Sequence, residues 1–311
     1  MIRVGICSWV DAALIEDGSF YPKKSMDAEA RLRWYARFFD TVEINSSFYA
    51  IPDARNAVRW AERTPSGFLF NVKAYAPMTG HHPRPETLPA DVQRVLPRQP
   101  RLTRRGEIDS GALPREALDH VFRLFGDSLR PLVEAGKLGY VLFQLAPWVR
   151  FDHARLEYLA SLRQRLPGLT LAVEFRDRSW FPHHADETLR ALRESGLAHV
   201  IVDAPPTPNA VPYVPGVTAS TAIFRLHGRN AEGWMRQLRG EEPTVREKYD
   251  YLYSEDELRA LQADVESAAE ESERVFVAFN NNNRAFPVTN ALMMKRLLGQ
   301  PSEPLARDLF S

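Results

Sequence analysis

Eight short apolar runs, separated mostly by helical patterns, constrain the fold of this 311-residue chain more than any other feature. The runs cover residues 2–7, 41–45, 68–73, 139–144, 170–175, 198–203, 221–227 and 275–280. Several are continuously apolar, as in Val141-Leu142-Phe143, which is typical of parallel strands covered by helices. Eight strands that alternate with helices predict a single TIM-type (β/α)8 barrel of the α/β class.

Helical patterns fill most of the gaps between these runs. They are expected at about 27–39, 53–64, 114–130, 152–166, 186–195, 254–271 and 289–298. Ser254 and Glu257 form a capping-box signature. The gap at 204–220 contains five prolines and is expected to be an extended loop. We predict one barrel domain over 1–299, which includes an insertion at 75–113, followed by a C-terminal tail at 300–311.

Four predicted strands end in a polar residue, an apolar residue and a second polar residue. Because strand side chains alternate between faces, the two polar residues of each set share one face. The pairs are Glu43 and Asn45, Asn71 and Lys73, Glu174 and Arg176, and Arg225 and His227. Other predicted strands end in Gln144, Asp203, Asn280 and Asn281. The carboxyl ends of barrel strands meet at one face, so we expect a shared polar pocket there.

Such a cluster is either an ionic network that satisfies itself or a ligand site, because unpaired buried charge is costly. As a site, it offers Glu43 and Glu174 as acid and base with His227 as their partner. The candidate ligand-binding residues are Asn45, Lys73, Gln144, Arg176, Trp180, Asp203, Arg225, Asn280 and Asn281. Trp180 is included because tryptophans in loops at the mouth can stack on a flat ligand. We expect Glu174→Gln to abolish turnover while folding is preserved.

Lys73 has two alternative roles in this cluster. Nearby cations would lower the pKa of its amine and allow it to form an imine, whereas adjacent carboxylates would have the opposite effect. In the second case Lys73 would make a simple charge contact with the substrate.

Composition argues against several other functions. The 40 lysines and arginines balance 40 acidic residues, so the bulk charge indicates neither nucleic acid nor an anionic membrane as partner. Cys7 is the one cysteine, which excludes a disulfide framework. No apolar stretch has transmembrane length and no signal peptide is visible, so a cytoplasmic location is expected.

The sequence predicts no cofactor and no metal ligand. It contains no G-x-G-x-x-G loop, so dinucleotide dependence is not expected. Carboxylates and His227 could supply oxygens and one nitrogen to a divalent metal, but no paired-histidine spacing supports such a site.

Two long insertions follow the third and seventh predicted strands, at about 75–113 and 228–253. Loops at this face of a barrel surround the active site, so both insertions could form lids. The first contains an arginine-rich stretch at 84–105, whose role the sequence leaves open.

The strand-end motifs together resemble the domain-of-unknown-function 72 family, also called YecE-like. The matching motifs include Thr41-Val42-Glu43-Ile44-Asn45, Leu142-Phe143-Gln144-Leu145, Val173-Glu174-Phe175-Arg176, Arg225-Leu226-His227-Gly228-Arg229 and Phe279-Asn280-Asn281. The resemblance spans nearly the whole chain. It implies a TIM-type barrel whose polar strand ends share a cavity, and it brings no established catalytic residues.

The favoured interpretation is an enzyme, a hydrolase, lyase or isomerase, that acts on a small polar or anionic molecule. One alternative is a barrel that binds or processes nucleic acid through the arginine-rich stretch. The other is a non-catalytic ligand-binding module. The sequence does not indicate the oligomeric state.

Overall fold

Eight parallel strands close into a barrel in chain order, and the last strand pairs with the first. The computed structural model describes residues 1–239, 241 and 244–303. The strands are β1 (Ile2–Cys7), β2 (Thr41–Ile44), β3 (Leu69–Lys73), β4 (Leu138–Gln144), β5 (Leu171–Glu174), β6 (Ala198–Asp203), β7 (Thr221–Leu226) and β8 (Arg274–Phe279). The predicted TIM-type barrel is confirmed, and each strand boundary lies within one residue of its expected position.

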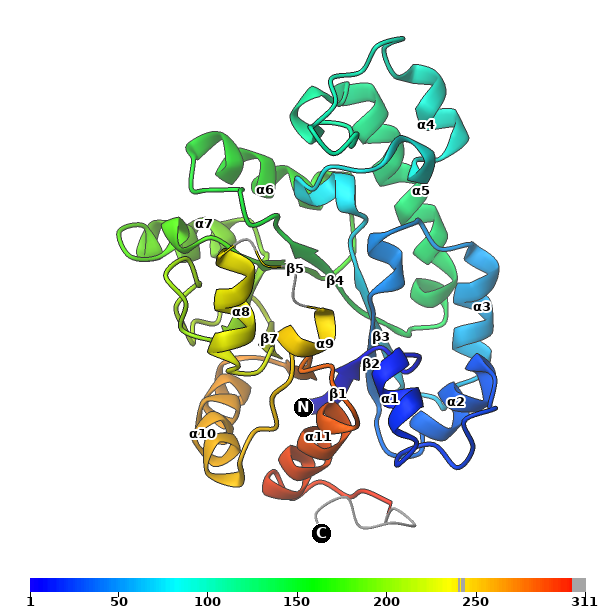
Figure 1. The fold of residues 1–311 in the computed structure, drawn as a ribbon, viewed down its shortest axis with the longest axis vertical. Helices are drawn as coiled ribbons and strands as arrows, with labels where there is room; N and C mark the ends of the chain where they lie inside the picture. Colours follow the sequence, from blue (N-terminus) through cyan, green and yellow to red (C-terminus); the bar gives the residue numbers. More distant parts are fainter. Residues whose placement is uncertain (240, 242–243, 304–311) are drawn as a thin grey trace.

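Helices surround the barrel, as Figure 1 shows. They are α1 (Ala12–Asp17), α2 (Ala28–Tyr35), α3 (Ala54–Glu62), α4 (Ala90–Val95), α5 (Arg115–Glu134), α6 (His153–Arg165), α7 (Ala185–Glu194), α8 (Ala231–Leu238), α9 (Val245–Lys248), α10 (Glu255–Glu271) and α11 (Phe286–Leu297). The predicted capping box is present at the start of α10, where Ser254 and Glu257 cap each other's backbone N–H groups. Residues 204–220 form no helix, as expected.

Inward-facing side chains fill the barrel with a small apolar core. Its members are Leu69, Tyr140, Leu142, Ala172, Ala198, Val200, Val202, Ile223 and Phe276. A larger apolar core lies between the outer faces of the strands and the helices. Farther along the strands the inward positions become polar, and the sheet register places Cys7 beside Glu43 and Gln144 beside Glu174. This change from apolar to polar residues on one face positions the candidate site at the carboxyl ends of the strands.

The two predicted insertions contain more regular structure than loops. Residues 75–113 include α4, three 3-10 turns and a β-bridge between Leu102 and Ile108. This insertion projects beyond the barrel at the top of Figure 1. Residues 228–253 carry the short helices α8 and α9.

The start of the predicted tail is attached to the barrel. The Gln300 side chain donates to the Ile2 carbonyl at 3.0 Å, and Glu303 pairs with Arg37 at 2.7 Å. The rest of the predicted tail, 304–311, lies outside the described residues. Within the described ranges, no helix is both long enough and apolar enough to cross a membrane.

Candidate functional site

Arg225 of β7 binds two carboxylates at the centre of the barrel mouth. Its Nε and Nη2 donate to Glu43 at 3.0 and 2.7 Å, and its Nη1 donates to Glu174. All three side chains are at most 1% exposed. The Tyr140 hydroxyl also donates to Glu43 at 3.3 Å, and Cys7 Sγ accepts from Nη2 at 3.7 Å. Burial lowers the pKa of Arg225, but the two carboxylates raise it more, so this guanidinium stays charged.

Glu174 accepts hydrogen bonds from several donors besides Arg225. Its Oε1 accepts from Gln144 Nε2 at 2.7 Å, from His227 Nε2 at 3.2 Å and from Arg176 Nη1 at 3.2 Å. Burial raises the pKa of this carboxyl, but the Arg225 charge and His227 outweigh burial and hold the pKa well below its usual range. Glu174 is therefore ionised at neutral pH and is unsuited to donate a proton.

His227 lies next to Glu174 and is also fully buried. Burial lowers the pKa of the imidazole to about 4, although Glu174 acts in the opposite direction. The Asn280 amide donates to Nδ1 at 2.8 Å, so Nε2 carries the proton and donates it to Glu174. Both ring nitrogens of this neutral histidine are thus engaged.

Lys73 of β3 extends from the same cluster toward the surface. Its Nζ donates to Gln144 Oε1 at 2.8 Å and lies 4.2 Å from the centre of the Phe48 ring. Burial and the Arg225 charge lower the pKa of the amine to about 8, against the pull of the two carboxylates. A substantial fraction of Lys73 is therefore neutral in mildly alkaline solution.

Lys137 shows how a buried lysine is held when its role is structural. Its Nζ donates to the Ala61 carbonyl and to both the carbonyl and the hydroxyl of Thr64, at 2.6 to 3.0 Å. Lys73, by contrast, has the single Gln144 carboxamide as its hydrogen-bond acceptor within the described part of the chain. Lys73 is half-buried, and its remaining N–H groups have no acceptor among the described residues.

A cavity of about 360 Å³ adjoins the cluster on the side of β5 and β6. Arg176, Trp234 and Lys248 line it, together with Thr207 and Asn209. The Arg176 guanidinium lies 5.1 Å from the Trp234 ring, and Lys248 Nζ lies 4.0 Å from the same ring. Burial and the Arg176 charge lower the pKa of Lys248 to about 8. The cavity therefore combines an aromatic wall with two cationic groups and one carboxylate, that of Asp177.

Most of the predicted site residues come together at this mouth. Hydrogen bonds connect each of them to Glu174, either directly or through one intermediate residue. The connected residues are Glu43, Lys73, Gln144, Arg176, Arg225, His227 and Asn280. Asn45 follows β2, and its Oδ1 is buried without a hydrogen-bond partner within the described structure. Buried carbonyl oxygens are rarely unpaired, so this atom is a potential ligand contact.

Three of the predicted ligand-binding residues form hydrogen bonds outside this cluster. Trp180 is completely buried, and its Nε1 donates to the Val149 carbonyl at 2.9 Å. The Asn281 amide donates to the carbonyl of Tyr251 and to Asn290. The indole N–H of Trp180 and the NH2 group of Asn281 are thus bonded within the protein, whereas Asn281 Oδ1, like Asn45 Oδ1, is buried without a hydrogen-bond partner in the described structure.

Asp203 belongs to a second network, at the start of the insertion after β7. Both of its oxygens accept from Arg229, and the Tyr253 hydroxyl donates to it at 2.6 Å. Arg229 also pairs with Glu257 of α10 at 3.0 Å. Asp203 thus fixes the loop after β7 to α10 through bonds to both of its oxygens, and its role in ligand binding stays a prediction.

Sequence reasoning expected tryptophans of the loops at the mouth to face a ligand, and Trp234 is one of them. It did not identify Tyr140, which contacts Glu43 inside the barrel, or Lys248 of the cavity. Tyr140 shares the inward face of β4 with Gln144, so strand alternation would have predicted its position. Trp234 and Lys248 lie on α8 and α9, and no sequence signal indicated that these helices bring them to Arg176.

No metal centre is formed in the described part of the chain. Groups of three or more histidine, cysteine, aspartate or glutamate side chains arranged to hold an ion are absent there. The carboxylates considered as oxygen donors, Glu43 and Glu174, are occupied by Arg225.

The fold and the site define the class of protein: a TIM-type barrel with a buried ionic cluster and an open cationic mouth at the carboxyl ends of its strands. Residues 3–309 match the family described as protein of unknown function DUF72. The chain belongs to this family, as its motifs suggested.

Relatives of the chain share its full length. It is 33% identical over 317 residues to the UPF0759 protein YunF of Bacillus subtilis (strain 168), with 100% of both chains covered. The crystal structure of a DUF72 family protein from Enterococcus faecalis V583 superimposes with a TM-score of 0.78 at 27% identity, with full coverage of both chains. A DUF72 family protein from Thermotoga maritima MSB8 gives a TM-score of 0.71 at 30% identity and covers 96% of this chain and 100% of its own.

Proposed function

We propose that the protein is an enzyme that acts on a small anionic carbonyl compound through the amine of Lys73. The observation that carries this proposal is the environment of Lys73 Nζ. Nζ donates to the Gln144 carboxamide and lies over the Phe48 ring. Burial together with the Arg225 charge lowers the pKa of the amine to about 8. Enzymes activate a nucleophilic lysine by desolvation and by a neighbouring cation.

The charge of the mouth favours an anionic substrate. Two carboxylates, Glu43 and Glu174, face three cations, Arg225, Arg176 and Lys73. With Lys73 protonated, one unit of positive charge remains among these described side chains. With Lys73 neutral their charges balance, and Arg176 still presents its guanidinium to the neighbouring cavity. A carboxylate or phosphate group would complement this charge.

The neighbouring cavity has the size of a small-molecule site. Its volume of about 360 Å³ falls at the lower end of the range for ligand pockets. Arg176 contributes to both the cluster and the cavity, so a substrate bound to Arg176 would lie close to the ionic cluster.

The burial of the carboxylates changes the roles that the sequence suggested for them. Glu43, Glu174 and His227 are closed off from the surface and fully bonded. We assign them positioning roles: Glu174 holds Arg176 and the Gln144 carboxamide, and the latter holds Lys73. Hydrolysis by a carboxylate acid and base is disfavoured because Glu174 stays ionised. A lyase or isomerase reaction fits the site better.

The proposed chemistry starts with the neutral amine. Lys73 Nζ adds to the carbonyl carbon of the substrate, and the resulting carbinolamine loses water to form a protonated imine. The positive nitrogen then accepts electron density when a neighbouring carbon loses a proton or a carbon group. Addition of water to the imine releases the product and restores the amine.

Reductive trapping tests this proposal. The protein is incubated with pyruvate or glyoxylate and sodium cyanoborohydride at pH 8, and the modified lysines are identified by peptide mass spectrometry. We expect the adduct on Lys73 to form at least about tenfold faster than on solvent-exposed lysines, because a lower pKa leaves more neutral amine.

Two variants control the trapping experiment. Lys73→Arg should remove this adduct, and Lys248→Arg should leave the Lys73 adduct in place. Two results with the wild-type protein would contradict an imine-forming enzyme. One is labelling at the same rate on all lysines, and the other is labelling of other lysines with none at Lys73.

A further inference from the structure

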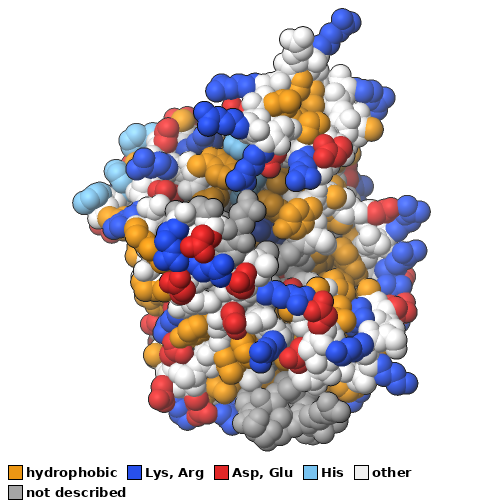
Figure 2. Space-filling model, in the orientation of Figure 1, with side chains coloured by type: hydrophobic (Ala, Val, Ile, Leu, Met, Phe, Trp, Pro, Cys, Tyr) orange, Lys and Arg blue, Asp and Glu red, His pale blue; other side chains and the backbone are white. Residues whose placement is uncertain are grey.

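We propose that a second pocket, between the insertion after β3 and the barrel, binds a planar aromatic ring that carries a phosphate group, such as a nucleoside monophosphate. This pocket has a volume of about 790 Å³ and lies outside the Lys73 cluster. Its walls come from the loops after β2, β3 and β4 and from the turn at 103–107. Figure 2 shows basic side chains around the hollow between the projecting insertion and the barrel.

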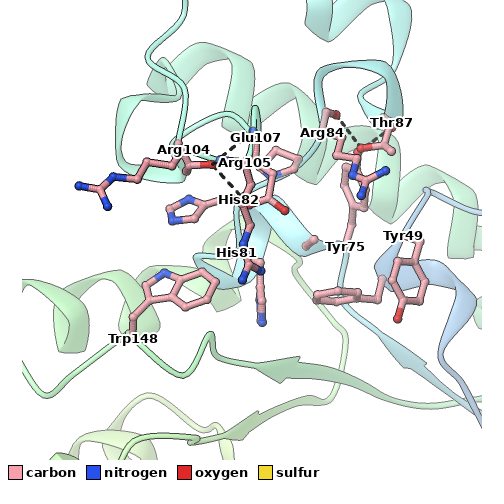
Figure 3. A pocket seen from close by; sticks show the side chains of 14 residues that line it. Tyr49, Tyr75, His81, His82, Arg84, Thr87, Arg104, Arg105, Glu107 and Trp148 are labelled. Atoms are coloured by element: carbon pink, nitrogen blue, oxygen red, sulfur yellow. Dashed lines mark hydrogen bonds between the residues drawn. The ribbon is translucent and has the colours of Figure 1, made fainter. Parts of the chain in front are cut away.

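Two large aromatic side chains at this pocket are open to solvent. Tyr49 is 71% exposed and Trp148 is 52% exposed. They lie on opposite sides of the pocket in Figure 3. Exposed aromatic rings at a concave site are suited to stack on a flat ligand.

Trp148 is held in position before any ligand binds. Its Nε1 donates to the Gly80 carbonyl at 3.1 Å, and its ring stacks on His82 with the centroids 4.9 Å apart. His82 Nδ1 in turn accepts from the backbone N–H of Ser110 at 3.0 Å. A ligand therefore does not have to order this aromatic wall, which lowers the entropic cost of binding.

Three arginines give the pocket its charge. Arg84, Arg104 and Arg105 line it together with one carboxylate, that of Glu107. In the described structure none of the three arginines forms an ion pair with another side chain. Guanidinium groups bind phosphate oxygens in a bidentate manner, so their presence in the same pocket as the aromatic rings favours a ring with an attached phosphate over either group alone.

A tight turn presents Arg104 and Arg105. Gly106 adopts a φ of 75°, which glycine tolerates, and its N–H donates to the Thr103 carbonyl at 3.0 Å. The Ile108 N–H donates to the Pro83 carbonyl at 2.8 Å and ties the turn to the segment that carries His82. The basic and aromatic parts of the pocket are therefore connected by backbone hydrogen bonds.

Phe48 lies between this pocket and the proposed reaction site. Phe48 lines the pocket and contacts Lys73 Nζ on one side. Its ring packs edge-on against that of His81, with the ring centroids 4.8 Å apart. Binding of a nucleotide here does not require chemistry at Lys73, so the two proposals can fail independently.

Calorimetric titration of the full-length protein with AMP, adenosine and inorganic phosphate tests the inference. We expect AMP to bind and each of its two parts to bind at least about tenfold more weakly, since each part lacks one set of contacts. The double variant Arg104→Ala/Arg105→Ala should weaken AMP binding by about tenfold or more, in line with the loss of charge-assisted hydrogen bonds.

The matched control is Arg94→Ala/Arg98→Ala, which removes two exposed arginines of the same insertion that do not line the pocket. It should change the affinity for AMP less than about twofold, because distant exposed charges are screened by salt. The inference is overturned if AMP does not bind at millimolar concentration, if phosphate binds as tightly as AMP, or if the control variant loses as much affinity as the test variant.

Discussion

Replacing Arg225 by methionine is expected to lower the free energy of unfolding by about 3–5 kcal/mol, which is typical when one partner of a buried ionic group is removed. Arg225 neutralises two carboxylates that have no access to solvent. Methionine has a similar length but no charge, so both Glu43 and Glu174 would lose their main partner. Urea unfolding followed by circular dichroism measures the change.

An exposed arginine provides the control for this experiment. Arg115 at the start of α5 is 90% exposed and lies 3.9 Å from Asp119. Arg115→Met should change the free energy of unfolding by less than about 1 kcal/mol, as for most surface ion pairs. Equal effects of the two substitutions would show that the Arg225 cluster is not the buried network described above.

Glu174→Gln is expected to cost about 3 kcal/mol of stability, in the range found for buried groups left without partners. Every partner of Glu174 is a donor: Arg225 on one oxygen, and Gln144, His227 and Arg176 on the other. Glutamine keeps one acceptor oxygen and replaces the other with an NH2 group, which would face a donor in either orientation.

This result would correct the expectation from the sequence that Glu174→Gln preserves folding. Glu157 of α6 is exposed, and Glu157→Gln serves as the matched control with an expected change near zero. Chemical denaturation of both variants decides between the two views. A Glu174→Gln protein as stable as the wild type would mean that Glu174 is more accessible, or less firmly bonded, than the structure shows.

The barrel could be predicted because each local pattern was consistent with the global fold. Continuous apolar runs such as 138–144 are buried on both faces, and the helical stripes between them cover the outside. Strand alternation also predicted that Glu43, Lys73, Glu174 and Arg225 would meet, because parity alone determines the face on which a side chain lies.

The depth and pairing of these groups could not be predicted in the same way. Alternation places Asp203 on the correct strand end, but Arg229, which binds it, follows β7 and turns toward α10. Trp180 follows β5 as expected, yet its indole packs inward on Phe175 rather than toward the mouth. Such choices depend on loop conformation and on competition among partners, and neither is encoded in the spacing of residues along a strand.

The most direct test of the central claim is the pH dependence of Lys73 reactivity. Competitive labelling with trace acetic anhydride, read by mass spectrometry of the peptide that contains Lys73, reports the fraction of neutral amine at each pH. Because burial and Arg225 lower the pKa, the rate should rise with pH to a half-maximum near pH 8. A solvated lysine has its half-maximum near about 10.4. A Lys73 profile that coincides with that of a solvated lysine would contradict the proposed reactive amine.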